Sequence, residues 1–333
     1  MAQAADGVKD IETVRALATQ YSNWGRWGPD DELGTLNHLT PADVARACAL
    51  PVKGEVHSLA IPYDSRGPQI GRSDGRRFNP VHLMISDGGD IHDDDAYLRD
   101  NRMTKDGSDR YLRATDDLII MPLQSGTQWD ALAHIFFEGR MYNGFPTTDV
   151  TSKGARRNDV RRASGTMVGR GVLLDLPRAQ GREWLEPGEP SGTAELTACE
   201  QAQGGVVGRG DIVLVRTGHL AHSKDGRSWG SYVGGSCPGL GLESVPWIAE
   251  REIAAMATDT WPFEVLPNET ADVLQPLHIV LISFLGLWIG EMFDLEALAQ
   301  SCAHDGAYEF LFVGPPLPFT GAVGSPLNPI AIR

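Results

Sequence analysis

Cysteines are few in this sequence, and none stands in a pairing pattern. Cys48, Cys199, Cys237 and Cys302 form no C-x-x-C pair and no repeated spacing, so we expect neither a disulfide framework nor a cysteine zinc site. Long apolar runs are also missing, because the longest, residues 279–289, is shorter than the ~20 residues of a membrane-spanning helix. The first ten residues lack the apolar core of a secretory signal. We therefore expect a cytoplasmic protein with no membrane partner.

Basic residues are in the minority. Lys and Arg number 29 against 44 Asp and Glu, which leaves a formal net charge of −15. Binding to nucleic acid depends on clustered basic side chains that neutralise phosphates, so we expect no nucleic-acid partner. One local cluster, Arg156, Arg157, Arg161 and Arg162, is interpreted as a solvated face or as a set of partners for the many carboxylates.

Two short stretches suggest a functional motif, but their surroundings or spacing do not fit it. Residues 71–75 match the G-x-S-x-G pattern of a hydrolase nucleophile, but no strand pattern precedes them and no helix pattern follows, so we reject the match. The acidic stretch 87–95 lacks the ligand spacing of a calcium loop, and we expect an exposed acidic loop there. The sequence also contains no P-loop and no H-E-x-x-H motif.

The distribution of apolar residues predicts one mixed α/β domain. The 333 residues, 41% of them hydrophobic, show no repeat and no low-complexity linker. We expect an N-terminal extension, residues 1–22, and a single domain, residues 23–333. Apolar and β-branched runs predict strands at 56–61, 118–121, 172–176, 212–216, 253–257, 279–285 and 310–313. Helical patterns predict helices at 41–50, 194–203, 243–251 and 295–303. Their uneven alternation favours a sheet-rich interior over a regular doubly wound sheet.

A polar stretch between apolar segments is the candidate site. Residues 124–134 read Gln-Ser-Gly-Thr-Gln-Trp-Asp-Ala-Leu-Ala-His and follow the predicted strand 118–121. Side chains alternate along an extended backbone, so four polar residues of this stretch would share one face: Gln124, Gln128, Asp130 and His134. Burying such a face costs free energy unless its groups are paired or bind a ligand. The stretch therefore predicts a binding or catalytic site.

This stretch resembles the signature H-x-G-T-H-x-D-x-P-x-H of the cyclase family of metal-dependent hydrolases, which includes bacterial kynurenine formamidases and isatin hydrolase. The matching residues are Gly126, Thr127, Asp130 and His134. Gln124 and Gln128 stand in place of two histidines, and Leu132 stands in place of the proline. The similarity covers most of the chain after Asn23, through blocks at residues 23–28, 31–37, 169–175, 210–218 and 276–278, with Glu291 downstream.

The resemblance implies a fold, an assembly and a ligand set. The fold is of the swivelling β/β/α type, an α/β domain around a mixed, partly barrel-like sheet, and the assembly is a homodimer or homotetramer. Asp130, His278 and Glu291 take metal-ligand roles, Gln124 and Gln128 occupy two further ligand positions, and His134 is the proton-transfer residue. An imidazole nitrogen suits zinc, whereas an amide oxygen suits manganese or magnesium. The expected cofactor is a divalent ion: manganese or zinc, with magnesium as a third candidate.

The activity implied by the resemblance is hydrolysis of an amide, ester or lactone bond in a small-molecule substrate, aromatic or cyclic, by metal-activated water. Candidates for an aromatic wall of the pocket are Trp24, Trp27, Phe136, Phe137 and Tyr142. Asp259, Trp261 and Glu264 follow the predicted strand 253–257 and are further candidates for the pocket lining. Two alternatives stay open. The Gln substitutions allow a binding or scaffold protein that kept the fold without the ion, and His134 allows a cyclising enzyme that uses no metal. For His278, the alternative interpretation is a core histidine bonded to backbone.

Overall fold

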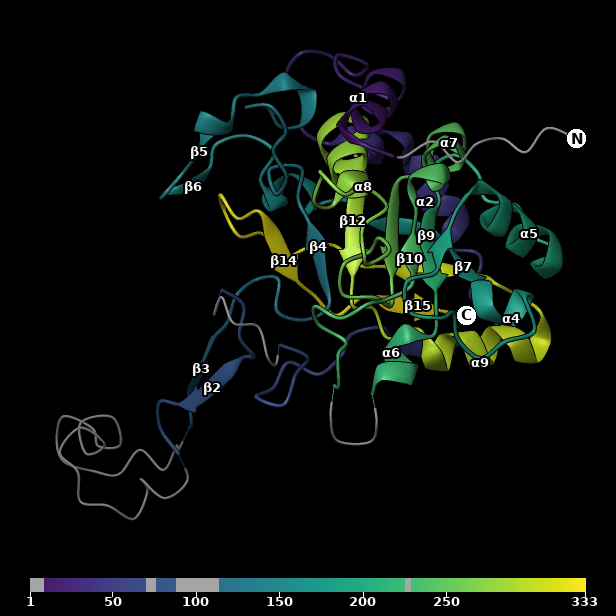
Figure 1. Ribbon diagram of the computed structural model, residues 1–333. Coiled ribbons are helices and arrows are strands. Elements are labelled where there is room, and N and C mark those ends of the chain that lie inside the picture. The colour runs from purple at the N-terminus through teal and green to yellow at the C-terminus, as the bar shows by residue number, and fades with distance from the viewer. Residues whose placement is uncertain (1–8, 70–75, 88–113, 225–228) are drawn as a thin grey trace, which may run out of the picture.

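The computed structural model describes residues 9–69, 76–87, 114–224 and 229–333, so the predictions for residues 71–75 and 88–95 concern segments outside the described residues. Within the described residues, nine strands form one mixed sheet (Figure 1). In spatial order these are β1 (Val56–Ser58), β15 (Ile330–Ile332), β13 (Glu309–Val313), β7 (Val168–Asp175), β9 (Ile212–Arg216), β11 (Ala255–Thr258), β12 (Trp288–Glu291), β4 (Gln128–Asp130) and β14 (Gly324–Pro326). The four consecutive strands β7, β9, β11 and β12 are parallel, and the flanking pairs are antiparallel. The expected mixed sheet is confirmed.

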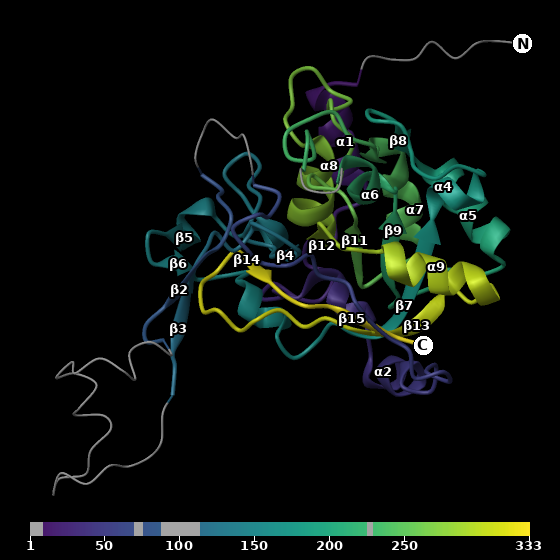
Figure 2. The ribbon, with the colours of Figure 1, turned by 90° about the horizontal axis from the view of Figure 1, so that it is seen from below.

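Helices pack on both faces of the strands β7 and β13 (Figure 2). Helix α2 (Pro41–Ala47) contacts β7 and β13, and α5 (Thr193–Gln203) contacts β7 from the opposite side. The remaining α-helices in the described residues are α1 (Ile11–Gln20), α4 (Leu176–Ala179), α6 (His219–Ser223), α7 (Val245–Glu250), α8 (Pro276–His278) and α9 (Glu296–Asp305). The 3₁₀ turns there are η1 (Gly34–His38), η3 (Tyr142–Gly144), η4 (Thr147–Asp149), η5 (Val160–Ala163) and η6 (Leu242–Ser244). The four predicted helices correspond to α2, α5, α7 and α9. In the part of the chain that the structure describes, no helix has both the length and the apolar character needed to cross a bilayer.

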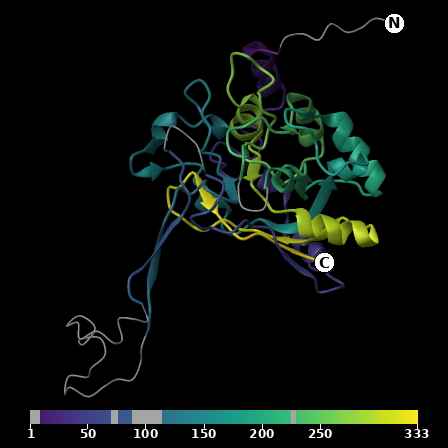
Figure 3. The same ribbon diagram turned by 60° about the horizontal axis from the view of Figure 1, so that its bottom comes forward.

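Three two-stranded ribbons accompany the main sheet in the described residues: β2 (Val81–Met84) with β3 (Asp117–Ile120), β5 (Val150–Thr151) with β6 (Gly154–Ala155), and β8 (Pro190–Ser191) with β10 (Gly239–Leu240). The ribbon β2–β3 stands away from the body of the molecule (Figure 3). Its aliphatic side chains, among them Leu83 and Ile119, are exposed. The chain enters this ribbon shortly after Arg77, which makes the base of the ribbon a neighbour of the site described below.

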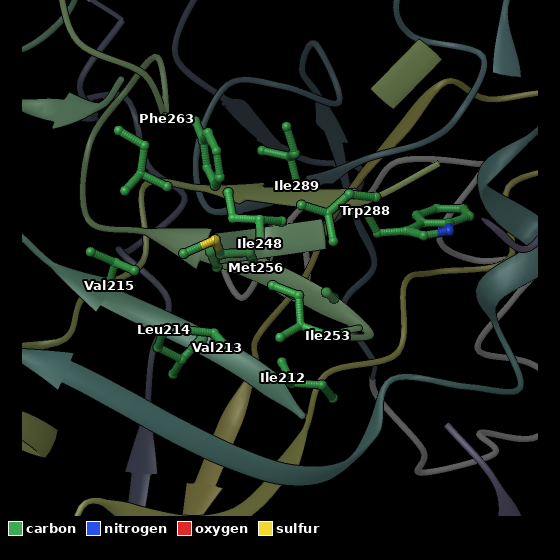
Figure 4. Packing of buried hydrophobic residues seen from close by; sticks show 14 of the residues in the cluster. Ile212, Val213, Leu214, Val215, Ile248, Ile253, Met256, Phe263, Trp288 and Ile289 are labelled. Carbon is green, nitrogen blue, oxygen red and sulfur yellow. The ribbon is translucent and has the colours of Figure 1, made fainter. Parts of the chain in front are cut away.

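The core lies between the parallel strands and the helices that cover them. Every residue of β9 and β11 is buried, and the side chains of Ile212, Leu214, Met256 and Ile289 pack together (Figure 4). A parallel strand covered on both faces is apolar along its whole length instead of alternating. This explains why the runs at 212–216 and 253–257 predict strands correctly. The predicted strands at 56–61, 118–121, 172–176 and 310–313 likewise fall on β1, β3, β7 and β13 with shifted ends.

The strand predicted at residues 279–285 is wrong. These residues continue α8 as a π-helical segment, Ile279–Leu285 (η7), and all but Phe284 are buried. An apolar run that is buried on all sides has the same composition in a helix as in a strand, so its periodicity does not separate the two. Pro276 at the first position of α8 favours a helix start, and Gly286 at φ 75° ends the segment. Helix α1 packs against η7. The division into residues 1–22 and 23–333 stays a prediction.

Candidate metal centre

The pairing of β4 with β12 brings three polar side chains together. The strands are antiparallel, with Gln128 opposite Glu291. Gln128 and Asp130 lie two residues apart on β4 and therefore share a face with Glu291. The Nε2 atom of Gln128 donates a hydrogen bond to Oε2 of Glu291 over 2.8 Å and lies 3.4 Å from Oδ1 of Asp130. All three residues are buried in the core of the sheet.

His278, the last residue of α8, reaches the same point from the helix side. Glu264 accepts hydrogen bonds from the backbone N–H groups of Leu277 and His278 at 3.2 and 3.0 Å. The same carboxylate lies 2.5 Å from Nδ1 of the His278 ring. This contact fixes the ring so that Nε2 faces Glu291, 3.2 Å from its Oε1. A carboxylate on the far nitrogen of a histidine is the usual way in which proteins orient an imidazole ligand.

Asp130, His278 and Glu291 form a compact group of potential ligands. One atom from each lies within 4.8 Å of the others, and all three residues are buried. Burial and the nearby charge of Asp130 raise the pKa of Glu291 to about 7. Burial alone would lower the pKa of His278, but hydrogen bonds to Glu264 and Glu291 and the charges of these carboxylates raise it to about 10. Two adjacent buried carboxylates need positive charge to stay ionised.

Two oxygen atoms in this group are buried without a hydrogen-bond partner: Oδ2 of Asp130 and Oε1 of Gln128. A buried acceptor without a partner costs roughly 1–3 kcal/mol. A cation among these atoms would satisfy both acceptors and offset the repulsion between Asp130 and Glu291. Oxygen and imidazole nitrogen donors are suitable ligands for manganese, zinc or magnesium. The residues present therefore fit a divalent ion.

The other two predicted site residues lie beside the group and outside the strand. Strand β4 spans only Gln128–Asp130, and Gln124 and His134 lie in turns, so the extended backbone assumed for residues 124–134 is wrong at both ends. The Nε2 atom of His134 lies 3.8 Å from Oδ2 of Asp130. Gly324 on β14 pairs with Asp130 on β4. A Cβ atom at Gly324 would lie 2.5 Å from Nε2 of Gln124. Glycine at 324 thus leaves the room that the Gln124 amide occupies.

A cavity of about 320 Å³ opens next to the group. Its walls include His134, His278 and Glu291, together with Arg76, Arg77, Trp261, Pro262, Leu266, Leu274 and Gln275. The predicted aromatic wall is therefore wrong. Trp24 and Phe137 pack instead against Phe284, and the Tyr142 hydroxyl donates to Asp31. The indole at the cavity wall belongs to Trp261, three residues before the orienting residue Glu264.

Strained backbone surrounds the group. Phe263, Gln275 and Met292 have φ angles of 59°, 50° and 59°, in the left-handed region that bulky residues rarely adopt. Phe263 precedes Glu264, Met292 follows Glu291, and Gln275 starts the helix that carries His278. Strain of this kind persists where the surrounding structure imposes it, and it clusters at functional sites.

Sequence reasoning missed the two arginines of the cavity wall, because Arg76 and Arg77 directly follow the rejected motif at 71–75 and belong to no pattern. Of the pocket candidates that follow β11, Trp261 lines the cavity and Glu264 holds His278, whereas Asp259 accepts hydrogen bonds from Thr217 and Gly218. Within the basic cluster, Arg157 and Arg162 both pair with Glu32, at 3.0 and 2.9 Å. These pairs agree with the interpretation of the cluster as carboxylate partners.

Comparison with known proteins places these features in a family. The family model described as "Putative cyclase" matches residues 57–265. A solved structure described as a novel cyclase is 36% identical, with 95% of this chain and 99% of that chain covered and a TM-score of 0.82. Isatin hydrolase A from Ralstonia solanacearum is 19% identical, with 98% and 99% covered and a TM-score of 0.60.

Isatin hydrolase A from Labrenzia aggregata, bound to benzyl benzoate, is 19% identical, with 83% of this chain and 93% of that chain covered and a TM-score of 0.56. No curated protein matches the sequence. At this identity, the likeness to the isatin hydrolases concerns the fold. Together with the novel cyclase it confirms the expected swivelling β/β/α architecture around a mixed, partly barrel-like sheet.

Proposed function

Because the chain belongs to the cyclase family, we propose that it is a metal-dependent hydrolase. Its reaction is the cleavage of an amide, ester or lactone bond in a small aromatic or cyclic substrate. The observation that carries this proposal is the buried group Asp130, His278 and Glu291, whose ligand atoms lie within 4.8 Å of one another beside a cavity of about 320 Å³. That volume lies in the range of small-molecule sites.

The three clustered residues would hold the ion, with the amide oxygen of Gln128 as a further donor. When bound, a divalent ion lowers the pKa of a coordinated water toward neutrality and polarises a carbonyl group. Glu264 keeps the His278 ring in place through Nδ1. We propose manganese or zinc as the ion and magnesium as the third candidate, since the donor set mixes imidazole nitrogen with hard oxygen atoms.

His134 moves the proton in this scheme. It lines the cavity with about 20% of its side chain exposed. Burial holds its pKa below the usual range, so the imidazole is neutral at pH 7 and its Nε2 atom can accept the proton that the attacking water loses. As the C–N or C–O bond breaks, the same nitrogen returns the proton to the leaving group. A general acid and base of this kind contributes roughly 10²–10⁴-fold to the rate.

The test is metal reconstitution of purified protein with a panel of small amides, esters and lactones. We expect chelation to abolish hydrolysis and manganese or zinc to restore it. Asp130→Ala should remove activity, and His134→Ala should reduce it by roughly 10²–10⁴-fold while metal binding is kept. The exposed pair Lys53 and Asp305 lies away from the cavity, so Lys53→Ala serves as the control.

The two alternative functions predict different results. A scaffold protein that kept the fold would bind no ion and hydrolyse nothing in the panel. A cyclising enzyme that uses His134 without metal would keep its activity in chelator and in Asp130→Ala, and would lose it in His134→Ala. Hydrolysis that is indifferent to both substitutions would contradict the assignment of this site.

The assembly is also a proposal. The family resemblance implies a homodimer or homotetramer, and light scattering on the purified full chain measures this directly. A mass of one chain at micromolar concentration would contradict the proposed assembly without touching the metal centre.

A further inference from the structure

One cation at the cavity wall has no anionic partner in the described part of the chain. Arg77 is half-buried and lines the cavity together with His134, His278 and Glu291. Its guanidinium forms no hydrogen bond or ion pair with the described residues. Other arginines with little exposure are paired: Arg170 with Asp211 at 3.1 Å, and Arg216 with Asp175 at 2.9 Å.

Once the proposed ion is bound, Glu291, the one carboxylate among the described residues of the cavity wall, has a partner other than Arg77. A divalent cation would cancel the charges of Asp130 and Glu291, the two carboxylates at the centre. Glu264 is already engaged by the ring and backbone of His278. Because Arg77 lines the cavity, its guanidinium is available to a ligand bound there.

The cavity wall also includes apolar residues. Pro262 is buried, Leu266 is half-buried, and the indole of Trp261 lies beside them. An apolar wall takes the hydrocarbon body of a ligand, and a few placed polar groups fix its orientation. Arginine is suited to a carboxylate because its planar fork donates two parallel N–H bonds to the two oxygens.

We propose that Arg77 binds a carboxylate group of the substrate, so that the hydrolase acts on small carboxylic acids that carry the scissile bond. This inference rests on the proposed function and names the substrate class of the same site. The apolar body of the acid lies along Pro262 and Leu266, with the scissile carbonyl toward Asp130 and His278. Arg77 is a specificity-determining residue in this account, because it touches a part of the substrate that does not react.

The inference is tested by binding, without turnover. Benzoate and its neutral isostere benzamide are titrated by calorimetry into the full chain, once with saturating manganese and once after chelation. The variants are Arg77→Gln, Arg77→Lys and the control Arg209→Gln, whose side chain lies 3.7 Å from Glu252 away from the cavity. Thermal unfolding of each variant establishes that it is folded.

We expect Arg77→Gln to weaken benzoate binding by about tenfold or more, the effect of losing a charge-assisted pair, and to leave benzamide binding unchanged. The benzoate affinity of Arg77→Lys should lie between those of the wild type and Arg77→Gln, because lysine keeps the charge and lacks the planar fork of arginine. Equal benzoate affinity in the wild type and Arg77→Gln would overturn the inference, since the carboxylate would then bind elsewhere, for instance to the ion. An equal loss of benzamide affinity in Arg77→Gln would also overturn the inference, and so would a wild type that binds neither benzoate nor benzamide.

A kinetic readout separates this role from stabilisation of the reaction's transition state. For a substrate with a carboxylate, Arg77→Gln should raise KM and leave kcat nearly unchanged, whereas a group that stabilises the developing oxyanion would lower kcat. A fall in kcat alone would overturn the inference. Because the benzoate titration needs no hydrolysis, a failure of the proposed hydrolase activity and a failure of the Arg77 assignment are distinguishable.

Discussion

Gln128 donates its side-chain amide to Glu291 over 2.8 Å, from directly opposite positions on β4 and β12. This contact occupies a position where the family signature has a histidine. The donating amide leaves its own oxygen buried without a partner, next to the unpartnered Oδ2 of Asp130. The replacement therefore keeps a polar donor at the centre of the site, and in the proposed metal centre it exchanges a nitrogen ligand for an oxygen ligand.

Gln128→His should shift the metal preference toward zinc, because an imidazole is a softer ligand than an amide oxygen. We expect the affinity for zinc to rise relative to that for manganese by on the order of tenfold, or about 1.4 kcal/mol. Competitive titration with a chromogenic chelator measures both affinities. The control is Gln180→His, at an exposed glutamine that accepts a hydrogen bond from Arg182 outside the site. An unchanged zinc-to-manganese ratio in Gln128→His would argue against a ligand role for this position.

Glu264→Gln should weaken metal binding although Glu264 is not itself proposed as a ligand. The substitution replaces the carboxylate that holds Nδ1 of His278 at 2.5 Å, and removal of such partners typically costs 10–100-fold in metal affinity. Titration of the chelator-treated protein with manganese or zinc measures the change. Glu269→Gln is the matched control, since Glu269 pairs with Lys9 at 2.5 Å outside the site. Equal losses in the two variants would show a general structural effect.

Acid should destabilise the fold through His219. Burial lowers the pKa of His219 to about 4, so between pH 4 and 6.5 the unfolded chain binds the proton and the folded chain does not. The sign follows directly: stability is fully present above pH 6.5 and falls as the pH is lowered toward 4. At pH 5 the loss is about 2 kcal/mol, at 1.36 kcal/mol for each pKa unit.

Urea unfolding at pH 7.5 and pH 5 measures this loss, with His219→Phe as the comparison. Phenylalanine keeps a ring against Tyr232, on which His219 stacks, and does not titrate. The variant should lose less stability than the wild type between the two pH values. Parallel losses in both proteins would show that His219 titrates as readily in the fold as in the unfolded chain.

Leu214→Ala should lower the free energy of unfolding by about 2–5 kcal/mol, because it removes a fully buried side chain from the central strand β9 and leaves a cavity. Chemical denaturation measures the change. Val206→Ala, at a residue that is 64% exposed, should change the stability by no more than about 0.5 kcal/mol. A similarly small change for Leu214→Ala would contradict a stabilising role of β9 in the core.

The central strands could be predicted from the sequence because burial on both faces demands continuous apolar runs, as at 212–216. The run at 279–285 is equally apolar, but it forms a helix, so the strand predicted there is wrong. The group Asp130, His278 and Glu291 spans 161 positions of the chain, so no local spacing could bring it together, and only the family resemblance named its members. Arg77 belongs to no sequence motif, and only the structure shows that it lines the cavity. Metal binding, the substrate and the assembly stay predictions.

The most direct test of the metal centre is thermal unfolding of chelator-treated protein in titrations with manganese, zinc and magnesium. A ligand that binds only the folded state stabilises it, by about 2.7 kcal/mol at a hundred times its Kd. The account predicts that manganese or zinc raises the Tm of the wild type and fails to raise that of Asp130→Asn at the same concentrations. No rise with any of the three ions, or an equal rise in Asp130→Asn, would contradict it.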